Sequence, residues 1–161
     1  MTLSIDPATP HDVPLILDLI RELAEYEREL ESAQATPAQI HDALFGERPA
    51  AEAVIARLDG EPAGWALWFQ NFSTWTGKPG LWLEDLYVRP RYRRQGVGRA
   101  LLAYLARLCV ERNYGRFEWS VLDWNTQALD FYRALGAEAM SQWTTLRLKG
   151  KALRRLAETE P

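Results

Sequence analysis

The most constraining feature of the sequence is an arginine- and glycine-rich segment between two apolar runs, from Arg89 to Arg99. The run before it, Leu81 to Val88, has apolar residues on both faces and is typical of a central strand. The run after it begins at Val97 and has leucines at helical spacing. Glycines let a backbone approach a ligand closely, and a helix N-terminus offers unpaired N–H groups to an anion. The segment therefore predicts a phosphate-binding loop between a strand and a helix.

The glycine spacing separates this loop from two common nucleotide-binding motifs. The sequence Arg93-Arg94-Gln95-Gly96-Val97-Gly98 has neither the G-x-G-x-x-G pattern of dinucleotide sites nor the G-x-x-x-x-G-K-[ST] pattern of nucleoside-triphosphate sites. An ordinary turn in a solvated basic face is the alternative, because G-x-G alone is common. The five arginines favour phosphate, since guanidinium groups match its geometry.

Length and composition place the chain among compact proteins. Its 161 residues are 47% hydrophobic and 25% charged, so we expect one domain over 1–161. A net charge of -3 gives no reason to expect a nucleic-acid or membrane partner. Cys109 has no second cysteine to pair with, no His and Cys cluster suggests a metal, and no apolar run approaches the roughly 20 residues of a membrane helix. We expect a cytoplasmic protein without a metal.

Hydrophobic periodicity and turn residues predict strands mixed with helices, hence an α/β fold in one layered domain. The expected strands are Leu3 to Ile5, Val54 to Leu58, Ala63 to Phe69, Leu81 to Val88, Phe117 to Leu122 and Thr144 to Leu148. The expected helices are Val13 to about Glu29, one starting at Thr36-Pro37, Val97 to Cys109, Thr126 to Leu135 and one around Leu153 to Leu156. In the last third, strand, crossover helix and strand predict a parallel pair.

Two adjacent carboxylates, Glu84 and Asp85, interrupt the apolar strand. In a regular strand they point to opposite faces, so at most one would face a given pocket. An unpaired carboxylate is costly to bury, which favours a cleft at this point of the strand.

The segment from Arg93 to Gly98, following a strand that ends in Tyr-Val-Arg-Pro, resembles the acetyl-CoA signature of the GCN5-related N-acetyltransferase (GNAT) family. Further stretches are similar to its diamine acetyltransferase branch, closest to the thialysine N-epsilon-acetyltransferase type. These stretches are Arg21 to Glu27, Ser73 to Trp75, Leu83 to Val88, Val121 to Asn125 and Phe131 to Ala137.

The resemblance implies a GNAT fold, with a mixed, mostly antiparallel central sheet flanked by helices, and acetyl-CoA as cosubstrate. Leu86, Tyr87 and Val88 would pair with the pantetheine arm, and Asn125 would hold the cofactor from the next loop. The implied pyrophosphate loop consists of Arg93, Arg94, Gln95, Gly96, Val97, Gly98 and Arg99.

The resemblance also implies direct attack of a primary amine on the acetyl group in a ternary complex. Tyr132 would protonate the departing thiolate, and Glu84 would draw the amine proton away through water. The implied substrate pocket contains Tyr26, Glu27, Trp75 and Asp85. The alternative for Tyr132 is a core position beside Phe131, and the alternative for Trp75 is dimer packing.

Three departures from the diamine acetyltransferases bear on specificity. Arg94 stands where they usually have glycine, Ser73 replaces an acid, and Met140 to Trp143 is short and lacks an acidic contact. Ser73 and the short segment favour a short lysine-like or thialysine-like amine over a polyamine, whereas Arg94 adds bulk beside the phosphates. A protein lysine or N-terminal acetyltransferase, or a non-catalytic acyl-CoA-binding module, are the alternatives.

A homodimer is expected on two grounds. This family branch assembles its amine pocket where two subunits meet, and the tryptophan-rich face of Trp65, Trp68 and Trp75 predicts an apolar surface larger than a monomer normally exposes.

Overall fold

The computed structural model describes all residues 1–161, in two compact units, Met1–Leu122 and Asp123–Pro161. The first unit contains a five-stranded sheet in the order β1-β2-β3-β4-β5. Its strands are β1 (Leu3–Pro7), β2 (Glu52–Leu58), β3 (Glu61–Ser73), β4 (Lys78–Val88) and β5 (Phe117–Trp119). The first three pairings are antiparallel and β4 pairs with β5 in parallel, which confirms the mixed, mostly antiparallel sheet.

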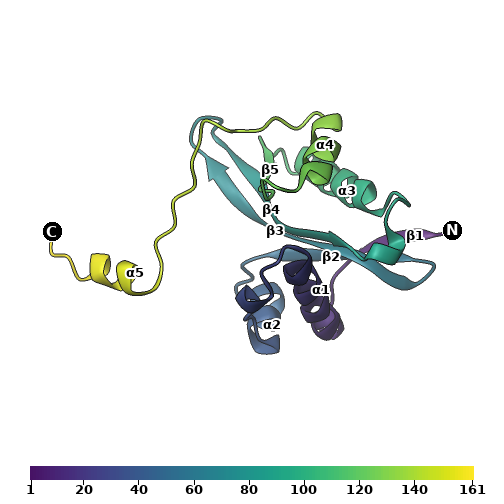
Figure 1. Cartoon of the computed structure of the whole chain (residues 1–161), viewed down its shortest axis with the longest axis horizontal. Coiled ribbons are helices and arrows are strands. Elements are labelled where there is room, and N and C mark those ends of the chain that lie inside the picture. Colours follow the sequence, from purple (N-terminus) through teal and green to yellow (C-terminus); the bar gives the residue numbers. More distant parts are fainter. The chain divides into compact units, whose positions relative to one another are not determined.

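Helices cover both faces of this sheet. Figure 1 shows α1 (Val13–Tyr26) and α2 (Pro37–Phe45) on one side and α3 (Val97–Glu111) on the other. The first unit also has three short 3-10 helices, η1 (Pro10–Asp12), η2 (Leu30–Ser32) and η3 (Pro90–Tyr92). The core on the α1 side consists of Ile16, Leu19, Leu44, Ala53, Ile55, Trp65 and Tyr87. Because helices cover both faces, β2 is buried on both faces from Ala53 to Ala56.

Two helix boundaries show what local sequence can predict. The predicted start of α2 is confirmed: the Thr36 hydroxyl accepts from the Gln39 amide, and the Gln39 side chain accepts from the Thr36 amide. The predicted end of the first helix near Glu29 is wrong, since α1 ends at Tyr26. Arg28 has a φ of 63°, in the left-handed region, which stops the helix although no glycine marks the position.

The two hairpins are tighter than expected. The β2–β3 turn consists of two residues with positive φ, Asp59 at 51° and Gly60 at 84°, so the expected start of the second strand at Ala63 is wrong and β3 begins at Glu61. In the next hairpin, β3 extends to Ser73 and β4 begins at Lys78. Both strands are therefore longer than the expected Ala63 to Phe69 and Leu81 to Val88. Gly80 permits this extension, because a Cβ there would lie 2.6 Å from the Asn71 side chain.

The second unit contains α4 (Thr126–Ala134) and α5 (Gly150–Ala157) and no strand. The predicted strand from Thr144 to Leu148, and with it the parallel pair of the last third, is wrong for this chain. The segment has alternating residues but no backbone partner, and Leu146 is 90% exposed. The predicted strand from Phe117 to Leu122 also ends early, at Trp119. No helix in the structure has the length and apolar character needed to cross a membrane.

Candidate functional site

A β-bulge in β4 brings the two adjacent carboxylates to one face of the sheet. Leu67 pairs with Asp85 but the next residue, Trp68, pairs with Leu83, so Glu84 is the extra residue. Paired residues share a face, and Leu67 packs against the core under α1, which puts Asp85 on that face.

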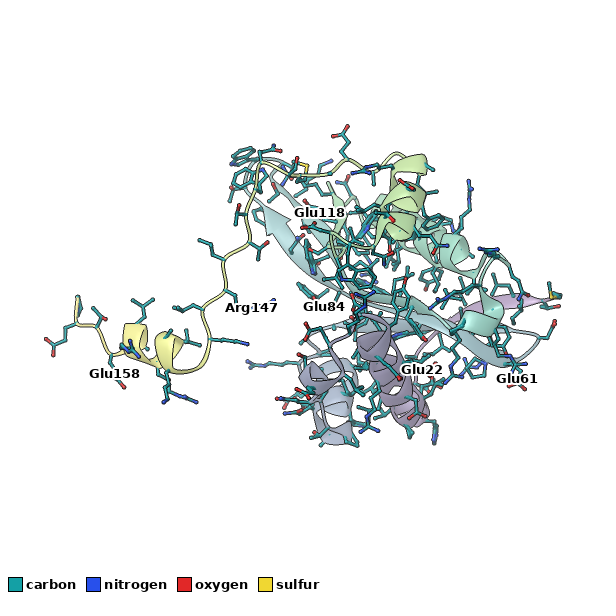
Figure 2. The ribbon with its side chains drawn as sticks, in the orientation of Figure 1. Glu22, Glu61, Glu84, Glu118, Arg147 and Glu158 are labelled. Atoms are coloured by element: carbon teal, nitrogen blue, oxygen red, sulfur yellow. The ribbon has the colours of Figure 1, made fainter.

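Glu84 is placed on the same face by a second route. Phe69, two residues after Leu67, pairs with Trp82, whose indole nitrogen donates to Oε2 of Glu84 at 3.1 Å. Glu84 thus lies on the side of β4 that faces α1 (Figure 2). The expectation that Glu84 and Asp85 point to opposite faces is wrong, because the bulge interrupts the alternation.

Asp85 is the most perturbed carboxyl of the site. Its burial, followed by the negative charges of Glu84 and Glu27, raises its pKa from 3.8 to about 6. Burial and the charge of Glu29 also raise the pKa of Glu27, the residue after α1. Glu84 itself is exposed. This arrangement of carboxylates, one half-buried and one exposed, attracts a cation and can accept a proton near neutral pH.

The outer edge of β4 is open beside these carboxylates. Its parallel pairing with β5 ends at Leu83, so β5 does not pair with the strand from Glu84 onward. The Arg89 amide donates to Ala63 of β3 at 2.8 Å, and backbone groups alternate along a strand. The N–H groups of Leu86 and Val88 therefore point to the open edge, where an extended ligand can pair with them.

The N-terminus of α3 supplies a second set of backbone donors. Gly96 precedes the helix with a φ of 82°, and the first amide with an acceptor there is that of Ala100, which donates to Gly96 at 2.9 Å. The amides of Val97, Gly98 and Arg99 have no backbone acceptor, as at any helix start. These donors and the exposed arginines around them suit a pyrophosphate. The exposed arginines are Arg91, Arg93, Arg94 and Arg99.

Arg94 adopts a backbone conformation that favours glycine. Its φ is 63°, which costs a residue with a Cβ roughly 1 kcal/mol or more. The diamine acetyltransferases, which the sequence resembles, usually have glycine here, and the left-handed backbone gives the physical reason. Arg94 therefore adds a charge to the loop at the cost of some strain.

Between β4 and α1, charged and aromatic side chains form a continuous layer. Arg89 donates to both carboxylate oxygens of Glu22, with Nη2 at 3.0 Å from Oε2, and the Tyr87 hydroxyl reaches Oε1 at 3.5 Å. The Arg93 guanidinium lies over the rings of Tyr26, at 4.9 Å, and Tyr87, at 5.7 Å. Burial, then the Glu22 charge, raises the pKa of Tyr87. Arg89 was expected among the five arginines suited to phosphate, but its side chain pairs with Glu22 of α1 instead. Glu22 was not expected in the site, and only its opposite charge offered a signal.

Comparison with known proteins agrees with this geometry. Residues 16–137 match the acetyltransferase (GNAT) family. The chain is 36% identical over 95% of its length to a thialysine N-epsilon-acetyltransferase of Sus scrofa, of which it covers 96%. It is 30% identical over 91% of its length to an L-ornithine N5-acetyltransferase of Arabidopsis thaliana, of which it covers 84%. The chain belongs to the GNAT family.

Membership of the GNAT family confirms the predicted fold and the predicted enzyme class, an N-acetyltransferase. A solved structure, an integron cassette protein from the mobile metagenome of V. cholerae, superposes with a TM-score of 0.82 at 23% identity and covers 99% of each chain. This likeness concerns the fold, whereas the thialysine acetyltransferase relatives support the predicted branch.

Two predicted site residues of this GNAT protein belong to the second unit, and a third lies in the turn between β3 and β4. Asn125 and Tyr132 belong to the second unit: Asn125 caps α4, accepting from the Ala128 amide at 3.2 Å, and Tyr132 lies beside Phe131 with ring centres 5.5 Å apart. Trp75 is 80% exposed in the turn between β3 and β4. Asp85 lies seven positions after Lys78 in β4, or roughly 20 Å along an extended strand, so the chain does not bring Trp75 to its own Asp85.

The tryptophan-rich apolar face predicted from the sequence does not exist. Trp65 is 0% exposed and Trp68 is 3% exposed, because helices cover both faces of β3 at these positions. Only Trp75 of the three lies at the surface. The argument for a dimer from this face is therefore wrong.

Proposed function

We propose that the protein transfers the acetyl group of acetyl-CoA to a primary amine of a small molecule, a thialysine-like amino acid or a diamine. The observation that carries this proposal is that β4 presents an acidic face, with Asp85 and Glu84, directly beside an open backbone edge at Leu86 and Val88. One ligand can pair with the edge while a cation binds at the face. The named relatives that act on thialysine and ornithine support a small amine.

The chemistry proposed for the site needs both carboxylates. An alkylamine has a pKa of about 10.4 and arrives as a cation, so it must lose a proton before it attacks. In our proposal Asp85, with Tyr26 and Glu27, binds the ammonium group, and Glu84 draws its proton away through water. The neutral nitrogen then forms a bond to the acetyl carbonyl carbon, and the bond from that carbon to sulfur breaks. The nitrogen loses its second proton to water as the neutral amide forms.

Cosubstrate binding is assigned to the open edge and the loop. We propose that Leu86 and Val88 offer backbone partners to the pantetheine arm, with N–H groups that polarise the acetyl carbonyl. The backbone of Tyr87, which was expected to take part, pairs with Trp65 of β3 instead. The loop from Arg93 to Arg99 surrounds the pyrophosphate with its backbone amides and with the guanidinium groups of Arg94 and Arg99. The open edge of β4 and the loop both fit acetyl-CoA, because each presents backbone N–H groups that have no backbone acceptor.

The second unit contributes the remaining two residues of the proposal. Tyr132 protonates the departing thiolate, for which a phenol with a pKa near 10 is a workable acid. Asn125 holds the cofactor from the loop before α4. The family match crosses from the first unit into the second, ending at residue 137, which supports one N-acetyltransferase domain over 1–161.

We further propose that the enzyme is a homodimer whose amine pocket is completed by Trp75 of the second copy. The separation of Trp75 from Asp85 along β4 supports this, since the chain's own Trp75 is too distant. Leu146, Leu153 and Leu156 are also exposed and offer apolar surface for a partner. We place the enzyme in the cytoplasm, where the buried free thiol of Cys109 is compatible with reducing conditions.

Release of free CoA across a panel of amines, amino acids and peptides tests the proposal. We expect turnover with thialysine, ornithine and short diamines, and none above background with lysine-containing or N-terminal peptides. Preferred turnover of peptides would favour a protein acetyltransferase. Binding of acetyl-CoA without turnover of any acceptor would favour a non-catalytic module.

A further inference from the structure

The side chain of Arg93 contacts two aromatic residues outside the phosphate-binding loop to which its backbone belongs. Arg93 begins the phosphate-loop signature, yet its guanidinium lies over Tyr26, at the end of α1, and Tyr87, in β4. Its Nε also donates to the carbonyl of Val88 at 2.9 Å. Arg93 therefore contacts both α1 and β4, the two elements that line the proposed amine pocket.

These contacts use the properties that distinguish arginine from lysine. A planar guanidinium can stack on two aromatic rings while its Nε–H donates in the plane, whereas an ammonium group cannot do both. The Val88 carbonyl lies at the open edge of β4 and accepts this bond. Tyr87 is fixed in turn by Glu22, which also holds Arg89.

We propose that Arg93 is a positioning residue for the amine pocket: it holds Tyr26, and with it the adjacent Glu27, against β4, while the neighbouring arginines of the loop hold the phosphates. The inference deepens the proposed function and rests on it. Arg94 is the natural contrast, because it is adjacent, equally charged and exposed.

The activity test compares Arg93→Gln with the matched variant Arg94→Gln. For Arg93→Gln we expect the amine KM to rise about 5-fold or more, with kcat and the acetyl-CoA Kd each changed less than about 2-fold. For Arg94→Gln we expect the acetyl-CoA Kd to rise about 3-fold or more with the amine KM unchanged. Arg93→Lys should behave as Arg93→Gln does, because it keeps only the charge. Weakened acetyl-CoA binding by Arg93→Gln with an unchanged amine KM would overturn the inference.

A second measurement needs no turnover and separates this inference from the proposed function. Denaturant unfolding of the free chain is compared for Arg93→Gln, Tyr26→Leu and the double variant. If the two side chains act as a unit, the double variant is destabilised clearly less than the sum of the single variants. Additive effects on the free energy of unfolding would show that Arg93 does not hold Tyr26 in place, and would overturn the inference. If the protein acetylated no amine, the proposed function would be wrong, but the unfolding comparison would still decide whether Arg93 positions Tyr26.

Discussion

In β4, the indole nitrogen of Trp82 donates a hydrogen bond of 3.1 Å to Oε2 of Glu84, two residues further along the strand. One carboxylate oxygen is thereby held in place, while the side chain stays exposed to water. Such an arrangement suits a group that passes a proton to solvent.

Glu84→Gln is expected to lower the rate most at low pH, where removing a proton from the amine is hardest. Trp82→Phe, which leaves the carboxylate but frees its oxygen, should lower kcat several-fold at an unchanged acetyl-CoA Kd. Initial rates between pH 6 and 9 check both variants. An equal loss by Glu84→Gln at every pH would make Glu84 an orienting group only.

Asp85→Asn is expected to stabilise the protein at neutral pH. The folded chain holds the Asp85 proton up to a pKa of about 6, and the unfolded chain releases it near 3.8, so folding takes up a proton between these values. The free energy of unfolding of the wild type therefore falls as pH rises through this window, by on the order of 3 kcal/mol. Asp85→Asn should recover this amount at pH 7 and flatten the profile.

The control for Asp85 is Asp18→Asn, which changes an exposed carboxyl on α1. Urea unfolding at pH 4, 5, 6 and 7 measures the profile for all three chains. The gain in stability should be accompanied by a higher amine KM. A wild-type profile that rises from pH 4 to 7 and is unchanged by Asp85→Asn would contradict the burial of this carboxyl.

Tyr132→Phe is expected to leave acetyl-CoA binding nearly intact and to lower kcat by roughly 100-fold, the usual scale for a positioned acid. Calorimetry gives the Kd and steady-state kinetics give kcat. Tyr104→Phe, on α3, is the matched change outside the proposed site. Unchanged turnover by Tyr132→Phe would leave the tyrosine as a packing residue beside Phe131.

Two inactive variants should complement each other if Trp75 acts across a dimer. Trp75→Ala and Glu84→Gln chains are unfolded together, refolded and assayed against each variant treated alone. Random pairing makes about half of the dimers mixed, each with one intact pocket of two, so about a quarter of the wild-type activity returns. Light scattering that gives the mass of one chain at micromolar concentration would exclude this arrangement.

Substrate choice should favour one ammonium group over several. The pocket offers the ring of Tyr26 and the carboxylates of Glu27 and Asp85, whereas Glu29 and Glu31 are exposed. We expect kcat/KM to be higher for thialysine than for spermidine or spermine, and added salt to weaken the longer polyamines more. A preference for spermine at moderate salt would show that the exposed glutamates form a true subsite.

Local sequence signals predicted most elements of the fold but not the detail that organises the site. Strands and helices followed from periodicity, and the α2 start followed from Thr36 and Gln39. The bulge at Glu84 was not predictable. Because β4 has apolar residues on both faces, its sequence does not show which residues face α1 and which face α3. The contact of Arg89 with Glu22 joins residues that are 67 positions apart, and nothing local indicates it. Trp65 and Trp68 were misplaced because their burial depends on helices far along the chain.

Because Glu84 is an extra residue, the alternation of side chains between the two faces of β4 changes at this position. Before it, the odd-numbered Leu81 and Leu83 face α3, and after it the odd-numbered Asp85 and Tyr87 face α1. Loss of Glu84 alone would leave regular pairing, Leu83 with Trp68 and Asp85 with Leu67, so the downstream side chains would keep their faces and only the exposed carboxylate would be lost. The extra residue therefore adds a second carboxylate to the face under α1 without altering the pairing on either side of it.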